Sequence, residues 1–278
     1  MSNAKIITKL AKTNSALLAG IVIVASFALM ALISSFWTPH NVAAIDAQNT
    51  LAPPSMQHPF GTNQFGRDVF SMMMVGAQTT ISIAFFAVSA ALLIGTPLGL
   101  IAGAFKFADE AIMRTSDVVF AFPAIILAIL LAAVFGPSAT NAAIAIAVFN
   151  IPVFARVTRG AALPLWTMNY VTAARALGKD RLTISLEHIL PNLAPVLIVQ
   201  ASVQFSMAVL AEAGLSYVGL GVQPPMPSWG HMLAESQTMA SFAPWLVLVP
   251  GLAIFLFVIG VNLIADGLRQ QIDQRDPS

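Results

Sequence analysis

Six long apolar stretches constrain the fold of this chain more than any other feature. An α-helix rises about 1.5 Å per residue, so about 20 residues are needed to cross about 30 Å of hydrocarbon. Because a bilayer offers no water to backbone groups, such segments are expected to be helices. The sequence therefore predicts an all-α polytopic membrane protein with six transmembrane helices. The six stretches cover residues 15–37, 77–105, 115–136, 139–157, 192–213 and 241–265.

The composition agrees with a membrane protein. Only 9% of the 278 residues are charged, against about 25% in a typical soluble protein. The chain has no cysteine, which excludes disulfides, thiolate metal sites and a cysteine nucleophile. No run of basic residues indicates a nucleic-acid partner. The apolar run at 15–37 exceeds the about 7–15 residues of a signal-peptide core, so we expect it to be retained as the first span.

The distribution of lysine and arginine predicts the orientation of the chain. With six spans and the N-terminus in the cytoplasm, all of the 13 Lys and Arg residues except Arg67 fall on the cytoplasmic side. This bias follows the positive-inside rule. Both termini are therefore expected in the cytoplasm, and the Pro- and Gly-rich loops 38–76 and 214–240 on the outer face.

The most charged part of the chain, residues 168–190, lies between two apolar stretches. Its composition predicts a helix over 168–177 that ends at Gly178, where a left-handed backbone costs glycine little. Asp180 is expected to cap a second short helix. One face of that helix should be apolar, because helical spacing relates Leu182, Leu186, Ile189 and Leu190. The segment reads either as an amphipathic connector on the lipid headgroups or as a docking site for another protein.

Two short patterns in this segment carry a family resemblance. AA-x-x-x-G at Ala173, Ala174 and Gly178, followed by H-x-L-P from His188 to Pro191, resembles the cytoplasmic "EAA" loop of ABC importer permeases. In that family the loop forms a coupling helix that sits in a groove of the ATP-hydrolysing subunit. The resemblance implies an ATPase-coupling role for Thr172 (in place of the usual Glu), Ala173, Ala174, Gly178, Lys179, Asp180, His188, Leu190 and Pro191.

Four further segments resemble the dipeptide/oligopeptide/nickel branch of these permeases, and specifically its "C" subunit. The resemblance implies a type I ABC importer permease fold. It also implies an N-terminal region 1–76, a permease domain 77–267 and a cytoplasmic tail 268–278. The four segments are HPFGTNQFGRDVFS (58–71), MRTSDVVFAFP (113–123), GLSYVGLGVQPPMPSWG (214–230) and NLIADGLRQQID (262–273).

The resemblance also implies a bacterial inner-membrane complex. Its partners would be a homologous second permease, two ATPase subunits and an external solute-binding protein that contacts loops 38–76 and 214–240. ATP and Mg²⁺ would bind the partners, since this chain lacks the G-x-x-x-x-G-K-[ST] loop: Gly178–Lys179 is followed by Asp180. We therefore expect no cofactor and no enzymatic activity in the chain. Short peptides are the implied cargo, with nickel or another metal chelate as the alternative.

Three polar residues on the fifth apolar stretch are candidates for a translocation path. Gln200, Gln204 and Glu212 share one stripe of a helix. Polar groups inside a membrane normally face protein or a water-filled path, so they form interhelical hydrogen bonds or line that path. Glu212 lies near the outer end, where solvation is expected. An ion-coupled secondary transporter would need intramembrane carboxylates, whereas Asp117, Glu212 and Asp266 lie near helix ends. A scaffold protein without transport is a third class.

Three smaller patterns complete the expectations. Gly95, Gly99 and Gly103 form GxxxGxxxG, which lets transmembrane helices pack closely. Asp117 and Arg114 are spaced for an ion pair within one helix. The sequence shows no H-x-x-H or other histidine–carboxylate pattern, so no metal site is predicted.

Overall fold

The structure, a computed structural model, describes residues 3–275 and the side chains of residues 15–271 except Ala124. Within that part of the chain it is helical, with one isolated β-bridge between Thr62 and Asp68 and no strand. The all-α prediction is confirmed. The elements are α1 (Asn3–Ser34), α2 (Val69–Ala104), α3 (Lys106–Ala121), α4 (Ala124–Phe135), α5 (Ala139–Leu165), α6 (Asn169–Ala176), α7 (Arg181–Ile184), a π-helical turn (Ser185–Ile189), α8 (Leu190–Tyr217), α9 (Trp229–Glu235), a 3₁₀ turn (Gln237–Met239) and α10 (Trp245–Arg275).

Five of the helices are long and apolar enough to cross a membrane. A sixth crossing exists only if α3 and α4 together make one span, and these two helices meet at 81°. The apolar stretch 115–136, expected as one helix, is therefore broken into two helices. Pro123 explains the break, because a proline disfavours helical backbone in the preceding residue. Phe122 is accordingly extended, with φ −98° and ψ 125°.

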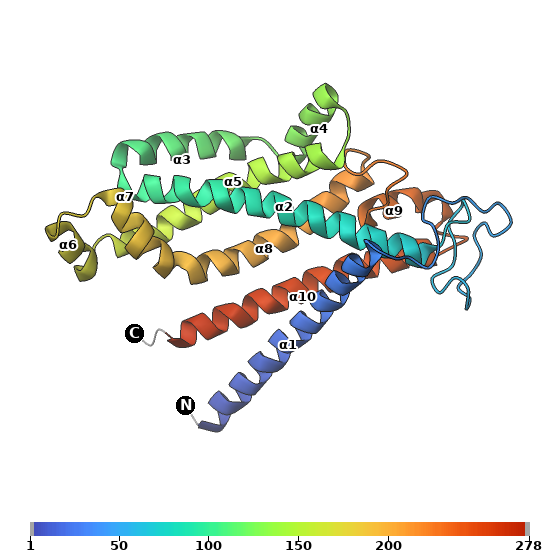
Figure 1. The fold of residues 1–278 in the computed structure, drawn as a ribbon, viewed down its shortest axis with the longest axis horizontal. Helices are drawn as coiled ribbons and strands as arrows, with labels where there is room; N and C mark the ends of the chain where they lie inside the picture. The colour runs from blue at the N-terminus through green and yellow to red at the C-terminus, as the bar shows by residue number, and fades with distance from the viewer. Residues whose placement is uncertain (1–2, 276–278) are drawn as a thin grey trace.

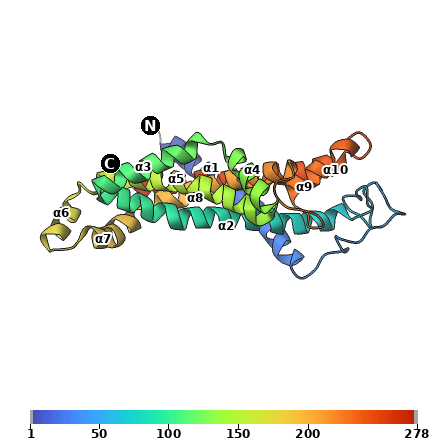
Figure 2. The same ribbon diagram turned by 90° about the horizontal axis from the view of Figure 1, so that it is seen from above.

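The axes of most long helices lie roughly along the long axis of the molecule, which therefore has two distinct ends (Figures 1 and 2). Helices α6 and α7 lie at one end, and loop 35–68 and α9 lie at the other. The N-terminal end of α1 and the C-terminal end of α10 lie toward the α6–α7 end, and α1 packs along α10. We name the two ends after the roles expected from the sequence: the end that carries α6 and α7 is called the coupling end, and the opposite end is called the outer end.

A row of glycines brings α2 and α5 into backbone contact. A Cβ atom at Gly95 would lie 2.5 Å from the Ile151 carbonyl oxygen, and one at Gly99 would lie 2.5 Å from the Ala155 carbonyl oxygen. Real Cβ atoms do not approach other atoms so closely. The close packing predicted from GxxxGxxxG is confirmed, and it joins the two helices that lead to the coupling end.

The outer end is ordered by side chains that return into the bundle. Trp229 of α9 is fully buried and makes edge-to-face contacts with Phe27 and Phe257. Its indole Nε1 donates to the Met73 carbonyl oxygen at 3.3 Å. A buried aromatic ring contributes a large apolar area and usually needs a partner for its N–H. Trp229 therefore fixes α9 against α1, α2 and α10.

Candidate functional site

The segment 168–190 folds as two short helices joined by a tight turn. Gly178 has φ +83° and follows α6. The Lys179 N–H donates to the Ala174 carbonyl at 3.2 Å, and the Gly178 N–H donates to the Arg175 carbonyl at 2.9 Å. These two bonds define a Schellman ending, in which a left-handed glycine satisfies the last carbonyls of a helix. Gly178 therefore ends α6 as predicted.

Asp180 begins the second short helix. Its carboxylate accepts the Thr183 N–H at 3.4 Å, and hydrogen bonding from Thr183 lowers the pKa of Asp180 below its ordinary value. The N-cap prediction is confirmed. The helix continues through the π-helical turn directly into α8, with Pro191 in the first turn of α8. Residues 181–217 thus form one continuous helical element.

An apolar cluster fixes the two short helices to the coupling ends of the long ones. Its members come from every element that meets there, and each is buried. They are Leu100 of α2, Ala162 of α5, Val171 and Ala174 of α6, Ile184 of α7, Ile189 of the π-turn, and Leu193 and Leu197 of α8. Movement of α6 or α7 would therefore be transmitted by direct packing to three of the long helices.

Two arginines add polar ties to the same neighbours. The Arg181 guanidinium donates to the carbonyl oxygen of Ala104, the last residue of α2. It also lies 5.6 Å from the centre of the Phe105 ring. Arg175 lies 5.2 Å from the centre of the Trp166 ring, just beyond α5. The segment is thus held to α2 through Arg181 and to the end of α5 through Arg175.

The free surface of the segment is partly different from the predicted one. Leu182 and Leu186 were expected on a common face with Ile189, yet they are 50% and 60% exposed while Ile189 is buried. Ile184 is buried together with Ile189 instead, because the π-turn at Ser185–Ile189 places residues five apart on one face, rather than residues three or four apart. Leu177, next to Gly178, is 82% exposed. The structure thus presents three leucines to the surroundings.

The other predicted coupling residues surround this apolar surface. Thr172, Ala173 and Gly178 are exposed, whereas Ala174 is buried. Lys179 forms an ion pair with Glu187 and lies 3.4 Å from His188 Nε2. The small residues and the charged residues therefore meet at one exposed tip. Exposed leucines beside polar and charged residues are typical of protein contact surfaces.

The candidate path residues do not lie together in an open channel. Gln200 and Gln204 are half-buried, but Glu212 is fully buried. Its Oε1 accepts a hydrogen bond from Ser216 Oγ at 2.7 Å, and that hydroxyl oxygen accepts the Val222 N–H. The expectation that Glu212 is solvated is wrong, because the chain after α8 folds back over it.

The cavity beside these residues is apolar. It measures about 770 Å³ and lies between α1, α2, α8 and α10. Val24, Phe85, Leu197 and Val261 are among its lining residues, and neither glutamine nor Glu212 lines it. Apart from Ser89, Thr96 and Ser202, its lining residues are apolar, so its walls offer a polar solute few hydrogen bonds. The cavity is therefore not by itself the polar path.

Ion pairs between helices replace the predicted pair within α3. Asp117 pairs with Arg156 of α5, and Asp109 pairs with Arg159 of α5. Arg114 instead lies 3.7 Å from Glu110, one turn earlier in α3. The prediction of an Arg114–Asp117 pair is wrong, and Asp109 and Asp117 hold α3 against α5 instead.

Residues 95–275 match the family of binding-protein-dependent transport system inner membrane components. The chain belongs to this family. It is therefore a permease component located in the inner membrane, and the family resemblance seen in the sequence is confirmed. The match covers α5, the segment 168–190 and α8 together.

Named relatives agree with membership of this permease family. The chain is 43% identical over 265 residues to the dipeptide transport system permease protein DppC of Alkalihalophilus pseudofirmus, covering 95% of this chain and 87% of that protein. It is 40% identical over 256 residues to the glutathione transport system permease protein GsiD of Pectobacterium atrosepticum, covering 90% and 85%.

A solved structure shares the fold of this permease. The chain superposes on a subunit of the MetNI methionine ABC transporter, in an inward-facing conformation, with a TM-score of 0.55 and 19% identity. The match covers 69% of this chain and 94% of that subunit. The type I importer permease fold predicted from the sequence is confirmed.

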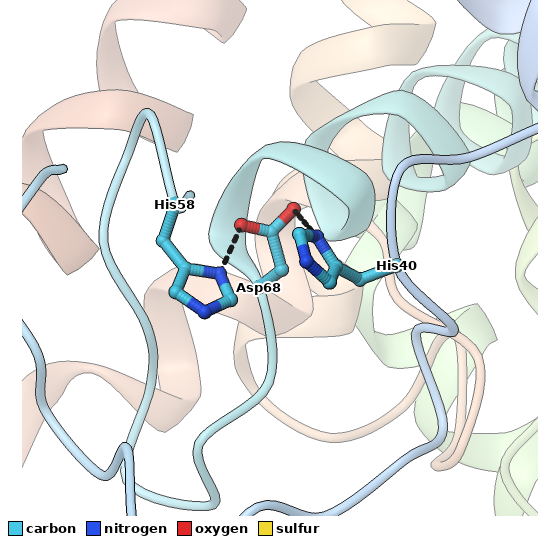
Figure 3. A group of neighbouring side chains, drawn as sticks. All are labelled: His40, His58 and Asp68. Atoms are coloured by element: carbon cyan, nitrogen blue, oxygen red, sulfur yellow. Dashed lines mark hydrogen bonds and ion pairs between the residues drawn. The ribbon is translucent and has the colours of Figure 1, made fainter. Parts of the chain in front are cut away.

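The permease also contains a cluster that the sequence analysis missed. His40, His58 and Asp68 place their ligand-capable atoms within 4.8 Å of one another. They come from two points of loop 35–68 and from the residue before α2 (Figure 3). Spacing along the chain gave no signal, because 17 residues separate the histidines and only the folded loop joins them.

Proposed function

We propose that this permease subunit carries short peptides into the cell as one half of an ATP-driven importer. The observation that carries the proposal is the 43% identity with a dipeptide permease over 95% of the chain. Dipeptides and glutathione are both short peptides, so the two groups of named relatives point to one class of cargo.

Uptake by cells tests this cargo. A strain that lacks the chain should lose ATP-dependent uptake of a labelled dipeptide or of labelled glutathione, and the restored gene should return it. Labelled nickel, free or chelated, serves as the comparison. Restoration of nickel uptake alone would replace the peptide assignment, and uptake that survives ATP depletion but not loss of the ion gradient would favour an ion-coupled transporter.

We further infer the partners of the complex. A homologous second permease would complete the path, two ATPase subunits with ATP and Mg²⁺ would bind the tip of segment 168–190, and a solute-binding protein would contact the outer loops. The exposed Leu177 and Leu182, bordered by Lys179 and Glu187, support a protein contact at the tip. Mild-detergent purification with mass spectrometry should recover these subunits, and recovery of the chain alone would contradict the inference.

The expected domain division needs a structural adjustment. The boundary proposed at 76/77 falls within α2, and the boundary proposed at 267/268 falls within α10. We therefore treat residues 1–76 and 268–278 as regions that continue into the permease bundle through these helices. The working unit that we propose for coupling is segment 168–190 together with α2, α5 and α8.

Replacement of Arg181 by methionine should uncouple the transporter. The change removes the bond to the Ala104 carbonyl while a long apolar side chain remains. ATPase subunits should still co-purify, because Arg181 faces α2, but peptide uptake should fall several-fold. Arg114→Met, which removes an exposed arginine of α3, is the control. Equal peptide uptake by the Arg181 and Arg114 variants at equal expression would contradict a coupling role for the Arg181–Ala104 hydrogen bond.

Replacement of Gln204 by leucine tests the proposed path. A glutamine that lines a path for a polar solute offers it hydrogen bonds that leucine cannot replace. We expect a several-fold lower rate of peptide uptake with unchanged insertion. Ala201→Leu, on the apolar wall of α8, controls for added bulk. Unchanged uptake by the Gln204 variant would assign this residue to helix packing alone.

A further inference from the structure

Two histidines and one aspartate meet at the outer end of the molecule (Figure 3). His58 Nδ1 lies 3.0 Å from Asp68 Oδ1, and His40 Nδ1 lies 3.6 Å from Asp68 Oδ2. The two imidazole rings lie side by side, with centroids 4.7 Å apart. We call His40, His58 and Asp68 the outer triad. Both imidazoles thus approach the same carboxylate from different parts of the loop.

The spacing within the outer triad suits a metal ion. Zinc binds imidazole nitrogen and carboxylate oxygen at about 2.0–2.2 Å, so neighbouring ligand atoms of a tetrahedral site lie about 3.4 Å apart. The two nitrogen–oxygen distances, 3.0 Å from His58 to Asp68 Oδ1 and 3.6 Å from His40 to Asp68 Oδ2, lie on either side of this value, and the ligand atoms of all three residues lie within 4.8 Å of one another. An ion would draw these atoms closer together, and the His40 side chain, which is 44% exposed, has room to rotate toward it.

The surrounding residues hold the aspartate as an oriented ligand. Asp68 is fully buried at the start of α2, and its Oδ2 accepts hydrogen bonds from the N–H and the hydroxyl of Ser71, each at 2.7 Å. The same Ser71 hydroxyl oxygen accepts a hydrogen bond from the backbone N–H of His40 at 3.0 Å. Metal ligands typically have such supporting hydrogen bonds, which fix their direction. Asp68 Oδ1 is thereby presented toward His58.

The contact of His40 with Asp68 is not an ordinary hydrogen bond. Its 3.6 Å separation exceeds the hydrogen-bond range, and the oxygen concerned already accepts two bonds from Ser71. The His40 ring thus lies beside the carboxylate and the His58 ring without a hydrogen bond to Asp68, which leaves its nitrogen available to an ion. The His40 side chain is 44% exposed, which leaves a route for an ion from outside.

We propose that the outer triad binds one divalent first-row transition-metal ion of the zinc or nickel type. Imidazole and carboxylate suit these ions, whereas Ca²⁺ and Mg²⁺ prefer six or more oxygen ligands. Three protein ligands leave a coordination position for water or an external ligand. The bound ion would fasten loop 35–68, which follows α1, to the first turn of α2. The proposal concerns a resident site on the outer face and does not depend on the identity of the cargo.

Metal analysis of the whole transporter tests the proposal. The complex is purified through a tag without histidine, incubated with Zn²⁺ or Ni²⁺, desalted and analysed for metal, and affinity is measured against a chromogenic chelator. The measured quantity is the difference between wild type and variants, which removes any metal held by partner subunits. We expect wild type to retain one more ion per copy of this chain than the double variant His40→Ala/His58→Ala.

Single variants separate ligation from folding. His58→Ala should weaken binding at least about tenfold, since even a supporting contact is worth about 10–100-fold in affinity. Asp68→Asn keeps an N-cap acceptor for Ser71 but supplies a poorer ligand, so it should bind weakly while the complex remains assembled. Arg114→Met, on the exposed surface of α3, should bind metal as wild type does. Equal metal content in wild type and the double variant, or stronger retention of Mg²⁺ than of Zn²⁺, would overturn the proposal.

Discussion

Replacement of Gly178 by arginine is expected to abolish peptide uptake while leaving the subunit inserted and folded. The site has room, because no atom lies within 4 Å of the position that a Cβ would take. The backbone at φ +83° costs a non-glycine residue about 1–2 kcal/mol, which a multi-helix bundle tolerates. The arginine would instead project from the tip between Leu177 and Lys179. Loss of close contact with the ATPase should weaken association about 100-fold, equivalent to about 3 kcal/mol.

A second glycine provides a matched control for the Gly178 variant. Gly219 ends α8 with φ +80° and open space around its Cβ position. The Leu220 and Gly219 N–H groups donate to Leu215 and Ser216 carbonyls, so the ending has the same Schellman form. Gly219→Arg should therefore carry the same backbone strain at the outer end. Co-purified ATPase should be lost from Gly178→Arg and retained in Gly219→Arg; retention in both would contradict docking at the tip.

Replacement of Gly99 by alanine is expected to destabilise the folded subunit strongly. The added methyl carbon would lie 2.5 Å from the Ala155 carbonyl oxygen and from Thr158 Cβ. Neither atom can move aside by side-chain rotation, so α2 and α5 have to separate. Overpacking typically costs about 1–3 kcal/mol, and a backbone obstruction places this site at the upper end. The unfolding temperature in detergent should fall by roughly 6–12 °C at about 3 kcal/mol.

Other glycines of the same helix pair give a graded comparison. Gly103→Ala would place its methyl carbon 3.2 Å from Ala162 Cβ, so a small adjustment suffices and the loss should be smaller. Gly160→Ala on α5 meets no atom within 4 Å, and alanine favours a helix by about 1 kcal/mol over glycine. We expect its unfolding temperature to remain equal or to rise. Equal unfolding temperatures for the Gly99 and Gly160 variants would show that this contact is not limiting.

The helical architecture was predictable because a segment that crosses a bilayer must be apolar over about 20 residues and must satisfy its own backbone hydrogen bonds as a helix. The break in the third stretch was not found, since hydropathy registers Phe122 and Pro123 as apolar residues and ignores their backbone preferences. Gly178 and Asp180 were correctly placed because caps depend on local geometry alone. The face of the next helix was wrong, because Leu182 and Leu186 follow a regular helical period that the π-turn interrupts.

Features that depend on distant parts of the chain were the least predictable. Glu212 is buried by the chain that returns after α8, where a Cβ on Gly230 would lie 2.2 Å from the Ala213 carbonyl oxygen. No sequence pattern near Glu212 predicts that contact. The outer triad likewise depends on the path of loop 35–68. The spacing of His40, His58 and Asp68 along the chain gives no signal, because only the folded loop brings the three residues together.

Helix α8, from Leu190 to Tyr217, has a mechanical consequence. Its 28 residues form a rod of about 42 Å at about 1.5 Å per residue. A tilt of about 10° around the middle of this rod would displace its two ends by about 4 Å in opposite directions. The inner end is anchored at the coupling segment and the outer end beneath α9. Such a tilt would narrow the path at one face of the membrane while it widens the path at the other face. The path therefore need not be open to both faces at the same time.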